Sequence, residues 1–552
     1  MKKLLLLIGA ATALGTFGGA SESALWPTER KKVVYLGRDI NSVGVADLLR
    51  NADAIERSGI DGIGMVLGVN DASGKSIGNS AYVLDSTSKW TREMMADADK
   101  MSRLKKVLAH KGMRESLMWT VSVPRKPLDW KDDARWECIA HNMGVLGWFV
   151  RESGLRGIYV DPEDYTKREW FFRHPGDAAT WEELSVLARK RARQIFTPMF
   201  RENPDMVVLG FWLFSLKPRQ SQSHDQMASA RGDNDLWPSF INGILDAIPE
   251  NGGVRLIDGN ENSYHYDALD NEFAISLAAQ LDAERGLVAP ENRAKFRRCF
   301  SPGFGVYLPS YVNEKGVDSG KYYYFAPYKG SRLGGLERNL SEMVRYTGEY
   351  VWIWDDARSW IKWDDKTKLP TGQWGVSRES YGDKLPGLYS IIRACFNPRE
   401  FLRVDAPELR KSGRMPNLVE GVDFLQKSRV ALYGPTGKKD AGEKGKGSLS
   451  HEIPNVKPGS HYVIAAEGVG ERICIAAAWR RTLPNERFRW HAWSDPGPMI
   501  PMKPIGGGRM RGADVIAVPE GADGLTFWVD LKPEPGQECY LDKVFIGEVP
   551  VK

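Results

Sequence analysis

The sequence predicts an α/β fold, a (β/α)8 TIM barrel followed by a C-terminal β-sandwich domain, and three observations lead to this prediction. The chain has 552 residues, 42% of them apolar and 27% charged, which suits two or three folded domains. Up to about residue 400, short apolar runs alternate with amphipathic stretches. Beyond that point, short runs of alternating apolar and polar residues stand between Pro and Gly, as in a β-sandwich.

The first part of the chain contains eight apolar runs, each followed by a helical stretch, which is the number that a (β/α)8 barrel needs. The predicted strands are 33–36, 62–67, 117–121, 157–160, 207–212, 254–257, 303–308 and 350–354. The predicted helices are 45–58, 97–110, 136–152, 181–201, 236–248, 271–284, 336–346 and 385–395. An open doubly wound sheet usually has fewer strands, so the count favours the barrel.

The two ends of the chain differ from this middle part. Residues 1–23 combine Lys2 and Lys3 with a short apolar stretch and small residues, the pattern of a bacterial signal peptide. We therefore expect a secreted or periplasmic protein with no membrane attachment after cleavage; an uncleaved anchor is the alternative. Residues 24–400 form the predicted barrel and 401–552 a linker with a β-sandwich accessory domain. Its predicted strands are 461–466, 473–479, 514–518, 526–531 and 539–546, and 432–450 is a Gly- and Lys-rich loop.

Composition and motifs exclude several classes of function. With 76 Lys plus Arg against 71 Asp plus Glu, the chain has no strong nucleic-acid footprint, and we expect no nucleic-acid partner. Its five cysteines are scattered, without zinc spacing. The motifs of metalloproteases, α/β-hydrolases, nucleotide-binding loops and dinucleotide-binding folds are absent. We expect no cofactor, although a structural Ca²⁺ held by loop carboxylates is compatible with the sequence. The oligomeric state is not indicated.

The residues that follow the predicted barrel strands carry the candidate chemistry, because active sites of such barrels lie at the carboxyl ends of the strands. Strand four ends in Asp161 and Glu163, which alternate and so share one side of an extended chain. Strand six is followed by Asp258 and Glu261. Further candidates follow other strands or these carboxylates: Asp39, Trp212, Tyr264, His265, Tyr311, Trp354 and Asp355.

Carboxylates interleaved with aromatic residues suit the cleavage of a glycosidic bond in an oligosaccharide or polysaccharide. One carboxylic acid protonates the leaving oxygen, a second group acts on the anomeric carbon, and aromatic faces pack on sugar rings. We predict Glu163 as the acid, because neighbouring carboxylates raise each other's pKa, with Asp161, Asp258 or Glu261 as the second catalytic group. The seven further candidates are predicted to bind the substrate.

Each candidate also has a structural interpretation. Asp258 and Glu261 can stabilise an Asx turn or support a neighbouring residue without touching the substrate. Trp354 can fill the barrel, and His265 can be a solvent-exposed loop residue. At the level of function, two alternatives stay open: a non-catalytic carbohydrate-binding protein on a degenerate barrel, and another carbohydrate-active enzyme such as a polysaccharide lyase.

The segment Gly157-Ile158-x-x-Asp161-x-Glu163-x-Tyr165 resembles the strand-four signature of chitinase-like glycoside hydrolases, D-x-x-D-x-D-x-E. The resemblance implies that Glu163 is the proton donor and that Asp161 orients the substrate's N-acetyl group. Arg156 and Tyr159 stand where that family has two earlier Asp residues. The resemblance covers about ten residues and indicates the TIM-barrel glycoside hydrolase superfamily rather than one family.

The strand ends are also similar to those of retaining α-glycosidases, which carry a nucleophilic Asp after strand four and an acid/base Asp after strand six. That resemblance implies Asp161 as the nucleophile and Asp258 as the acid.

Overall fold

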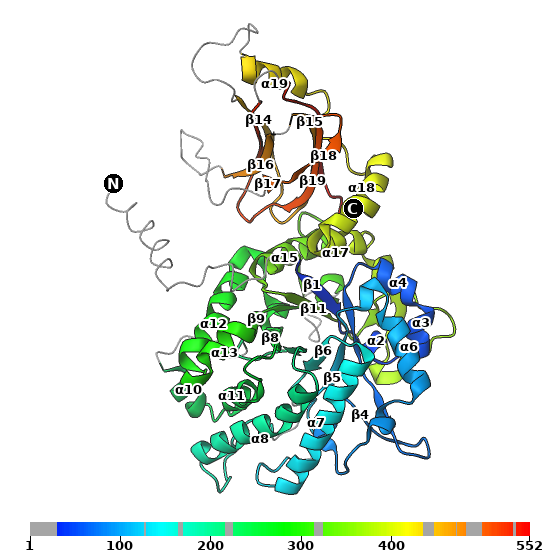
Figure 1. Cartoon of the computed structure of the whole chain (residues 1–552), viewed down its shortest axis with the longest axis vertical. Coiled ribbons are helices and arrows are strands. Elements are labelled where there is room, and N and C mark those ends of the chain that lie inside the picture. The colour runs from blue at the N-terminus through cyan, green and yellow to red at the C-terminus, as the bar shows by residue number, and fades with distance from the viewer. Residues whose placement is uncertain are drawn as a thin grey trace.

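The computed structural model describes residues 30–125, 128–163, 169–215, 225–313, 324–433, 447–470, 472–481, 499–533 and 537–551. The predicted signal peptide, residues 1–23, and most of the predicted loop 432–450 lie outside these ranges. Figure 1 shows a larger part with helices around a sheet and a smaller β part. Helices α17 (Leu388–Phe396) and α18 (Pro398–Lys411) lie between them.

The larger part is built on a sheet of nine parallel segments in the order β10-β11-β1-β2-β5-β6-β7-β8-β9. The segments are β1 (Lys32–Tyr35), β2 (Gly62–Met65), β5 (Leu117–Thr120), β6 (Gly157–Val160), β7 (Val207–Gly210), β8 (Arg255–Asp258), β9 (Phe300–Pro302), β10 (Phe304–Tyr307) and β11 (Tyr350–Trp354). Only Gly303 separates the two outermost segments; β9 pairs with β8, and β10 pairs with β11. The sheet is therefore nearly closed and barrel-like, and every predicted strand range overlaps one of its segments.

Helices cover the outside of this sheet (Figure 1). Because the strands are therefore buried on both faces, their sequences are continuous apolar runs. The α-helices that the structure describes in this part, including short ones at the strand ends, are α2 (Arg38–Asn41), α3 (Val45–Arg50), α4 (Ala52–Arg57), α5 (Arg92–Met95), α6 (Ala98–Leu108), α7 (Asp133–Ser153), α8 (Trp181–Glu202), α10 (Gln226–Gly232), α11 (Trp237–Ala247), α12 (Glu272–Gly286), α13 (Arg293–Cys299), α14 (Pro309–Val312), α15 (Arg332–Tyr346) and α16 (Tyr381–Lys384). Local signals set their ends: Thr180 and Glu183 form a capping box at α8, and the left-handed Gly154 ends α7.

The predicted helix 45–58 is two helices, α3 and α4, which meet at Asn51. The Asn51 amide donates to the carbonyl of Asp47 (2.9 Å), and its oxygen accepts from the backbone N–H of Asp364 (3.0 Å). The backbone of Asn51 leaves the helical region (φ −105°, ψ 8°), and these side-chain bonds hold the junction between the two helices. Two short pairs of strands complete this part: β3 (Gly68–Asn70) with β4 (Ser76–Asn79), and β12 (Arg358–Ser359) with β13 (Ser377–Ser380).

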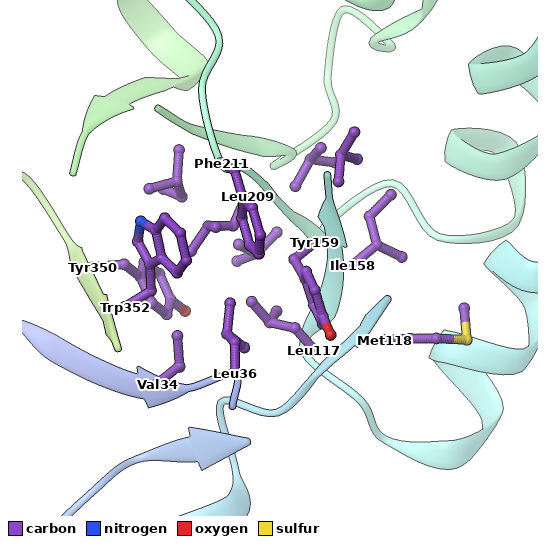
Figure 2. Close-up of a cluster of buried hydrophobic side chains, with 14 of the residues drawn as sticks. Val34, Leu36, Leu117, Met118, Ile158, Tyr159, Leu209, Phe211, Tyr350 and Trp352 are labelled. Atoms are coloured by element: carbon purple, nitrogen blue, oxygen red, sulfur yellow. The ribbon is translucent and has the colours of Figure 1, made fainter. Parts of the chain in front are cut away.

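Aromatic side chains fill the interior of the sheet, which is therefore a packed core rather than a pore. Figure 2 shows Tyr159, Phe211 and Trp352 meeting there among aliphatic residues. Phe211 stacks on Tyr159 (5.7 Å between centroids, 10°) and on Trp352 (4.1 Å, 14°). Trp119 also stacks on Tyr159, with 5.6 Å between the two ring centroids.

The smaller part consists of two four-stranded antiparallel sheets, β14-β20-β16-β17 and β18-β19-β15-β21. Side chains from both sheets form one apolar core, so the arrangement loosely fits a β-sandwich. The elements are α19 (Phe424–Tyr433), β14 (Gly447–Pro454), β15 (His461–Val469), β16 (Ile473–Arg480), β17 (Met499–Ile500), β18 (Met502–Gly506), β19 (Arg509–Ala517), β20 (Gly524–Leu531) and β21 (Tyr540–Glu548). The five predicted strands overlap β15, β16, β19, β20 and β21.

Buried polar contacts join the two parts. His461 of β15 is held by Glu337 of α15, with 2.9 Å from Nδ1 to Oε1, and its backbone N–H donates to the same oxygen. The Ser341 hydroxyl donates to the carbonyl of Gly459 (2.8 Å), and Arg338 pairs with Glu520 (2.8 Å). The smaller part therefore packs directly on α15.

Within the described residues, none of the helices combines the length and the apolar character that crossing a bilayer requires. All five cysteines fall in the described ranges, and there none of them is disulfide-bonded.

Candidate active site

Three of the four predicted catalytic carboxylates meet at the carboxyl end of the sheet. Asp161 and Glu163 follow β6 directly, and Glu261 lies in the short turn Glu261–His265 after β8. The charges of Asp161 and Glu163 both act on Glu261. Because the segments are all parallel, residues after β6 and β8 lie at the same end of the sheet.

The turn after β8 is fixed by its own residues. Asn260 adopts the left-handed conformation (φ 43°), which Asn tolerates better than most residues and which turns the chain out of the strand. The backbone N–H of Glu261 donates to the carbonyl of Phe211 (2.9 Å), at the end of β7. The Ser263 hydroxyl donates to the carbonyl of Gly305 in β10 (2.8 Å). The turn that carries Glu261 is thus attached to both β7 and β10.

The carboxylates raise each other's pKa. Burial and the neighbouring Glu163 charge raise the pKa of Asp161 to about 8, although Asp161 accepts a hydrogen bond from the backbone N–H of Glu163 (3.2 Å). Burial, then Glu163 and Asp161, raise the pKa of Glu261 well above its usual value. The cluster therefore retains a proton near neutral pH, which is what general acid catalysis requires.

Tyr264, three residues after Glu261, supplies a hydroxyl beside the carboxylates. Its ring is buried, and its hydroxyl has no hydrogen-bond partner among the described residues. Burial, Glu261 and Glu163 raise the pKa of Tyr264 well above its usual value, so the hydroxyl stays a donor. Gly305 leaves the room for this ring, because a Cβ there would lie 2.7 Å from Trp352 and 2.9 Å from Tyr264.

Trp354, at the end of β11, is half-buried beside this cluster of rings. It meets Trp119 edge to face at 6.3 Å and Phe211 at 5.7 Å between centroids. Of the predicted sugar-binding residues, Trp354 and Tyr264 are the two that the structure brings to the aromatic cluster around the carboxylates.

Asp258, the fourth predicted catalytic carboxylate, is fully buried and acts as an anchor for the loop after β7. Its two oxygens accept hydrogen bonds from the backbone N–H groups of Leu213, Phe214 and Ser215 at 2.8–3.0 Å and from the Ser215 hydroxyl at 2.5 Å. Burial raises the pKa of Asp258, and these donors oppose the rise. The contacts are those of a residue that positions the loop carrying Trp212.

Asp39 and Asp355 form a second buried pair, between the ends of β1 and β11. The Tyr35 hydroxyl donates to Asp39 (2.8 Å) and lies 3.5 Å from Asp355. Asp39 also accepts from the Trp360 backbone and the Trp363 indole, at 2.8 and 2.9 Å. Burial raises the pKa of Asp355 to about 7. Both side chains are fully buried, and they hold the segment after β11 in place.

The remaining predicted sugar-binding residues lie in other surroundings. Trp212 is buried after β7, with 3% of its surface exposed. Tyr311 in α14 stacks on Phe325 (4.8 Å), and its hydroxyl accepts from the Asn339 amide of α15 (2.7 Å). His265 is exposed, at the end of its turn.

Several residues near the site were not predicted. Trp119, Tyr159 and Tyr307 all contribute rings to the aromatic cluster, and Tyr307 donates to Asp356 (3.0 Å), which follows β11. The signal that could have found them is their position near the carboxyl ends of β5, β6 and β10, where an aromatic residue interrupts an aliphatic run.

Metal binding has no candidate cluster in the described part of the chain: no three His, Cys, Asp or Glu side chains there are arranged to hold an ion. The structural calcium ion stays a prediction.

Comparisons with known proteins do not assign a family. No family model matches the chain, and no curated protein matches it. Among solved structures, it is similar to the exo-β-1,4-mannosidase Op5Man5 from Opitutaceae bacterium strain TAV5 (11% identity, 70% of this chain and 63% of that chain, TM-score 0.37). It is also similar to Amy13B of Eubacterium rectale (8% identity, 92% and 96%, TM-score 0.36) and to endonuclease IV from Thermus thermophilus (11% identity, 59% and 92%, TM-score 0.30). Similarities of this size fix neither a family nor an activity.

Proposed function

We propose that the protein is a glycoside hydrolase that cleaves an oligosaccharide or polysaccharide, with Glu163 as the general acid and Glu261 as the second catalytic group. The observation that carries the proposal is the cluster of Asp161, Glu163 and Glu261, in which burial and mutual repulsion raise the pKa values of Asp161 and Glu261. Glycosidic cleavage needs such a pair, one carboxyl group protonated and one able to act on the anomeric carbon.

Asp161 serves this pair as a positioning residue. It is 8% exposed, whereas Glu163 and Glu261 are both half-buried and closer to solvent. Its buried carboxyl group keeps a proton within the cluster near neutral pH. In the proposal that proton passes from Asp161 to Glu163, which is nearer to solvent, and Glu163 transfers it to the leaving oxygen while Glu261 is charged. In the proposal the Tyr264 hydroxyl, which has no partner among the described residues, donates to the substrate.

The fold interpretation that accompanies this proposal treats β9 and β10 as one strand bent at Gly303. With β9 paired to β8 and β10 paired to β11, that strand would close a (β/α)8 barrel. The proposal also includes export, on the basis of the signal-like pattern of residues 1–23.

The test is a comparison of wild type with E163Q on a panel of glycans, with product analysis. We expect wild type to release reducing sugars and E163Q to lose about 10²–10⁴-fold in kcat, because the amide cannot donate the proton, while binding is retained. D99N, which makes the corresponding acid-to-amide change at an exposed carboxylate of α6, is the matched control.

Three outcomes would contradict the proposal. E163Q as active as wild type would exclude Glu163 as the acid. A wild-type protein that binds glycans without cutting them would be a non-catalytic carbohydrate-binding protein. Products that absorb in the ultraviolet would indicate a polysaccharide lyase.

A further inference from the structure

A pocket of about 560 Å³ opens at the carboxyl ends of β11, β1, β2 and β5, which are neighbours in the sheet. Its walls come from α2 and the residues after it, from the β3–β4 hairpin, and from the indoles of Trp119 in β5 and Trp354 in β11. The volume lies in the range of small-molecule sites. We call it the tryptophan pocket.

The two indoles give the pocket a rigid aromatic wall. They meet edge to face, with 6.3 Å between centroids and 83° between planes. Tyr159 stacks on Trp119, and Phe211 packs on Trp354, so each indole is supported by another ring. Both indoles are half-buried and line the pocket. A supported aromatic ring beside a cavity is a surface on which the C–H face of a sugar packs.

The pocket also offers hydrogen-bonding groups. The polar side chains of Ser42, Ser76 and Asn79 line the same pocket. Small polar groups around an aromatic wall suit a ligand that is rich in hydroxyl groups.

The charge of the pocket favours a neutral ligand. Of the described residues that line it, only Arg38 is charged, and the Arg38 guanidinium lies 3.9 Å from the Asp356 carboxylate. The positive charge is thus balanced within the protein, and a ligand needs no charge of its own to complement it.

We infer that the tryptophan pocket is a subsite that binds a neutral sugar ring of the same oligosaccharide whose glycosidic bond is cleaved at Glu163. Trp119, which lines the pocket, stacks on Tyr159, and Tyr159 stands in β6 two residues before Asp161. The inference rests on the proposed function. It adds the place at which the protein binds a sugar ring next to the one that reacts.

The experiment measures binding in the E163Q background, so that the ligand is not consumed. The probes are cello-, manno-, xylo-, malto- and chito-oligosaccharides of two to six units, measured by calorimetry. W354A removes one aromatic wall, and W119F replaces the indole of the other wall with a smaller ring. W148F is the matched control, because Trp148 is a half-buried indole on the outer helix α7.

We expect W354A and W119F to bind the longer members of one series about tenfold more weakly than the parent, and to bind its shortest members as the parent does, because only long ligands reach both regions. W148F should match the parent throughout. If W354A does not fold, which its thermal melting curve reveals, W119F decides the question.

The subsite is overturned, with the proposed function intact, if E163Q binds the series and both pocket variants bind every length as tightly as the parent. It is also overturned if only uronic acid oligosaccharides, added as a charged series, are bound through the pocket. If wild type neither binds nor cuts any glycan, the proposed function itself fails and the subsite fails with it.

Discussion

Asp161 and Asp258 are both buried aspartates at strand ends, yet their surroundings suit opposite roles. Asp258 accepts hydrogen bonds from four backbone N–H groups and a hydroxyl, all of which favour its charged form. Asp161 has one backbone donor and a carboxylate neighbour, Glu163, which disfavours that form. The donors around Asp258 thus suit a charged residue that anchors a loop. The like charge beside Asp161 suits a residue that holds a proton.

The first prediction concerns the pH dependence of turnover. D161N removes one of the charges that raise the pKa of Glu261, while the amide oxygen still accepts from the Glu163 backbone. The cluster then loses its last proton at a lower pH. We expect the alkaline limb of the kcat/KM profile to move down by on the order of one pH unit. The measurement is a pH profile on a cleaved glycan, with D99N as control; an unmoved limb in D161N would contradict the coupling.

At the scale of elements, the site depends on how closely β6 approaches β7. Gly157, the first residue of β6, has no room for a side chain, since a Cβ there would lie 1.9 Å from the carbonyl oxygen of Val207. Glycine at this position therefore lets β6 pair with β7 and places Asp161 and Glu163 at the end of the pair. A strand glycine is needed here for close backbone approach.

The second prediction tests this close approach. G157A should lower the free energy of unfolding by about 1–3 kcal/mol or more, because the added methyl group meets backbone that cannot move without breaking the β6–β7 pairing. G232A, at the end of α10, adds the same methyl group where nothing lies within 4 Å, and it should be neutral. Chemical denaturation of both variants makes the comparison; equal stabilities would show that β7 yields to the methyl group.

The strands and helices were predictable because apolar runs and amphipathic periods reflect burial, and burial decides where these elements form. The position of Glu163 was predictable for the same reason, since the strand before it is buried throughout. The anchoring role of Asp258 was not predictable from the sequence, because most of the groups that donate hydrogen bonds to it belong to residues 213–215, which are remote in sequence. Tyr311 likewise looks in sequence like any strand-end tyrosine, and only its contact with Asn339 reveals its packing.

At the scale of the whole molecule, a buried ion pair joins the two parts. His461 and Glu337 are 4% and 1% exposed, which is rare for ionisable groups unless they are paired. Burial lowers the pKa of His461, but Cys395 and Glu337 outweigh this effect and raise it to about 10. The contact with α15 therefore favours the protonated form of His461, while burial raises the pKa of its partner Glu337 as well.

The third prediction follows from this raised pKa. In the unfolded chain, His461 has a pKa of about 6.5, so its contribution to stability is complete below that pH and is lost as the pH rises towards 10. Wild type should lose up to about 5 kcal/mol more than H461Q across this range. Thermal melting from pH 6 to pH 10 measures the difference, and H451Q, in β14, is the control. Parallel curves for wild type and H461Q would rule out the protonated histidine.

The pairing of β1 with β11 has a consequence for the order in which the molecule assembles. These strands come from opposite ends of the larger part, and nearby Arg30 donates to the carbonyl of Phe396, 366 residues later. The first strand thus has a neighbour on one side only until the last strand has been synthesised. Contacts so distant in sequence form slowly, because the chain between them must be ordered first. A nascent chain therefore stays incompletely folded until β11, the last strand of its nine-segment sheet, has emerged.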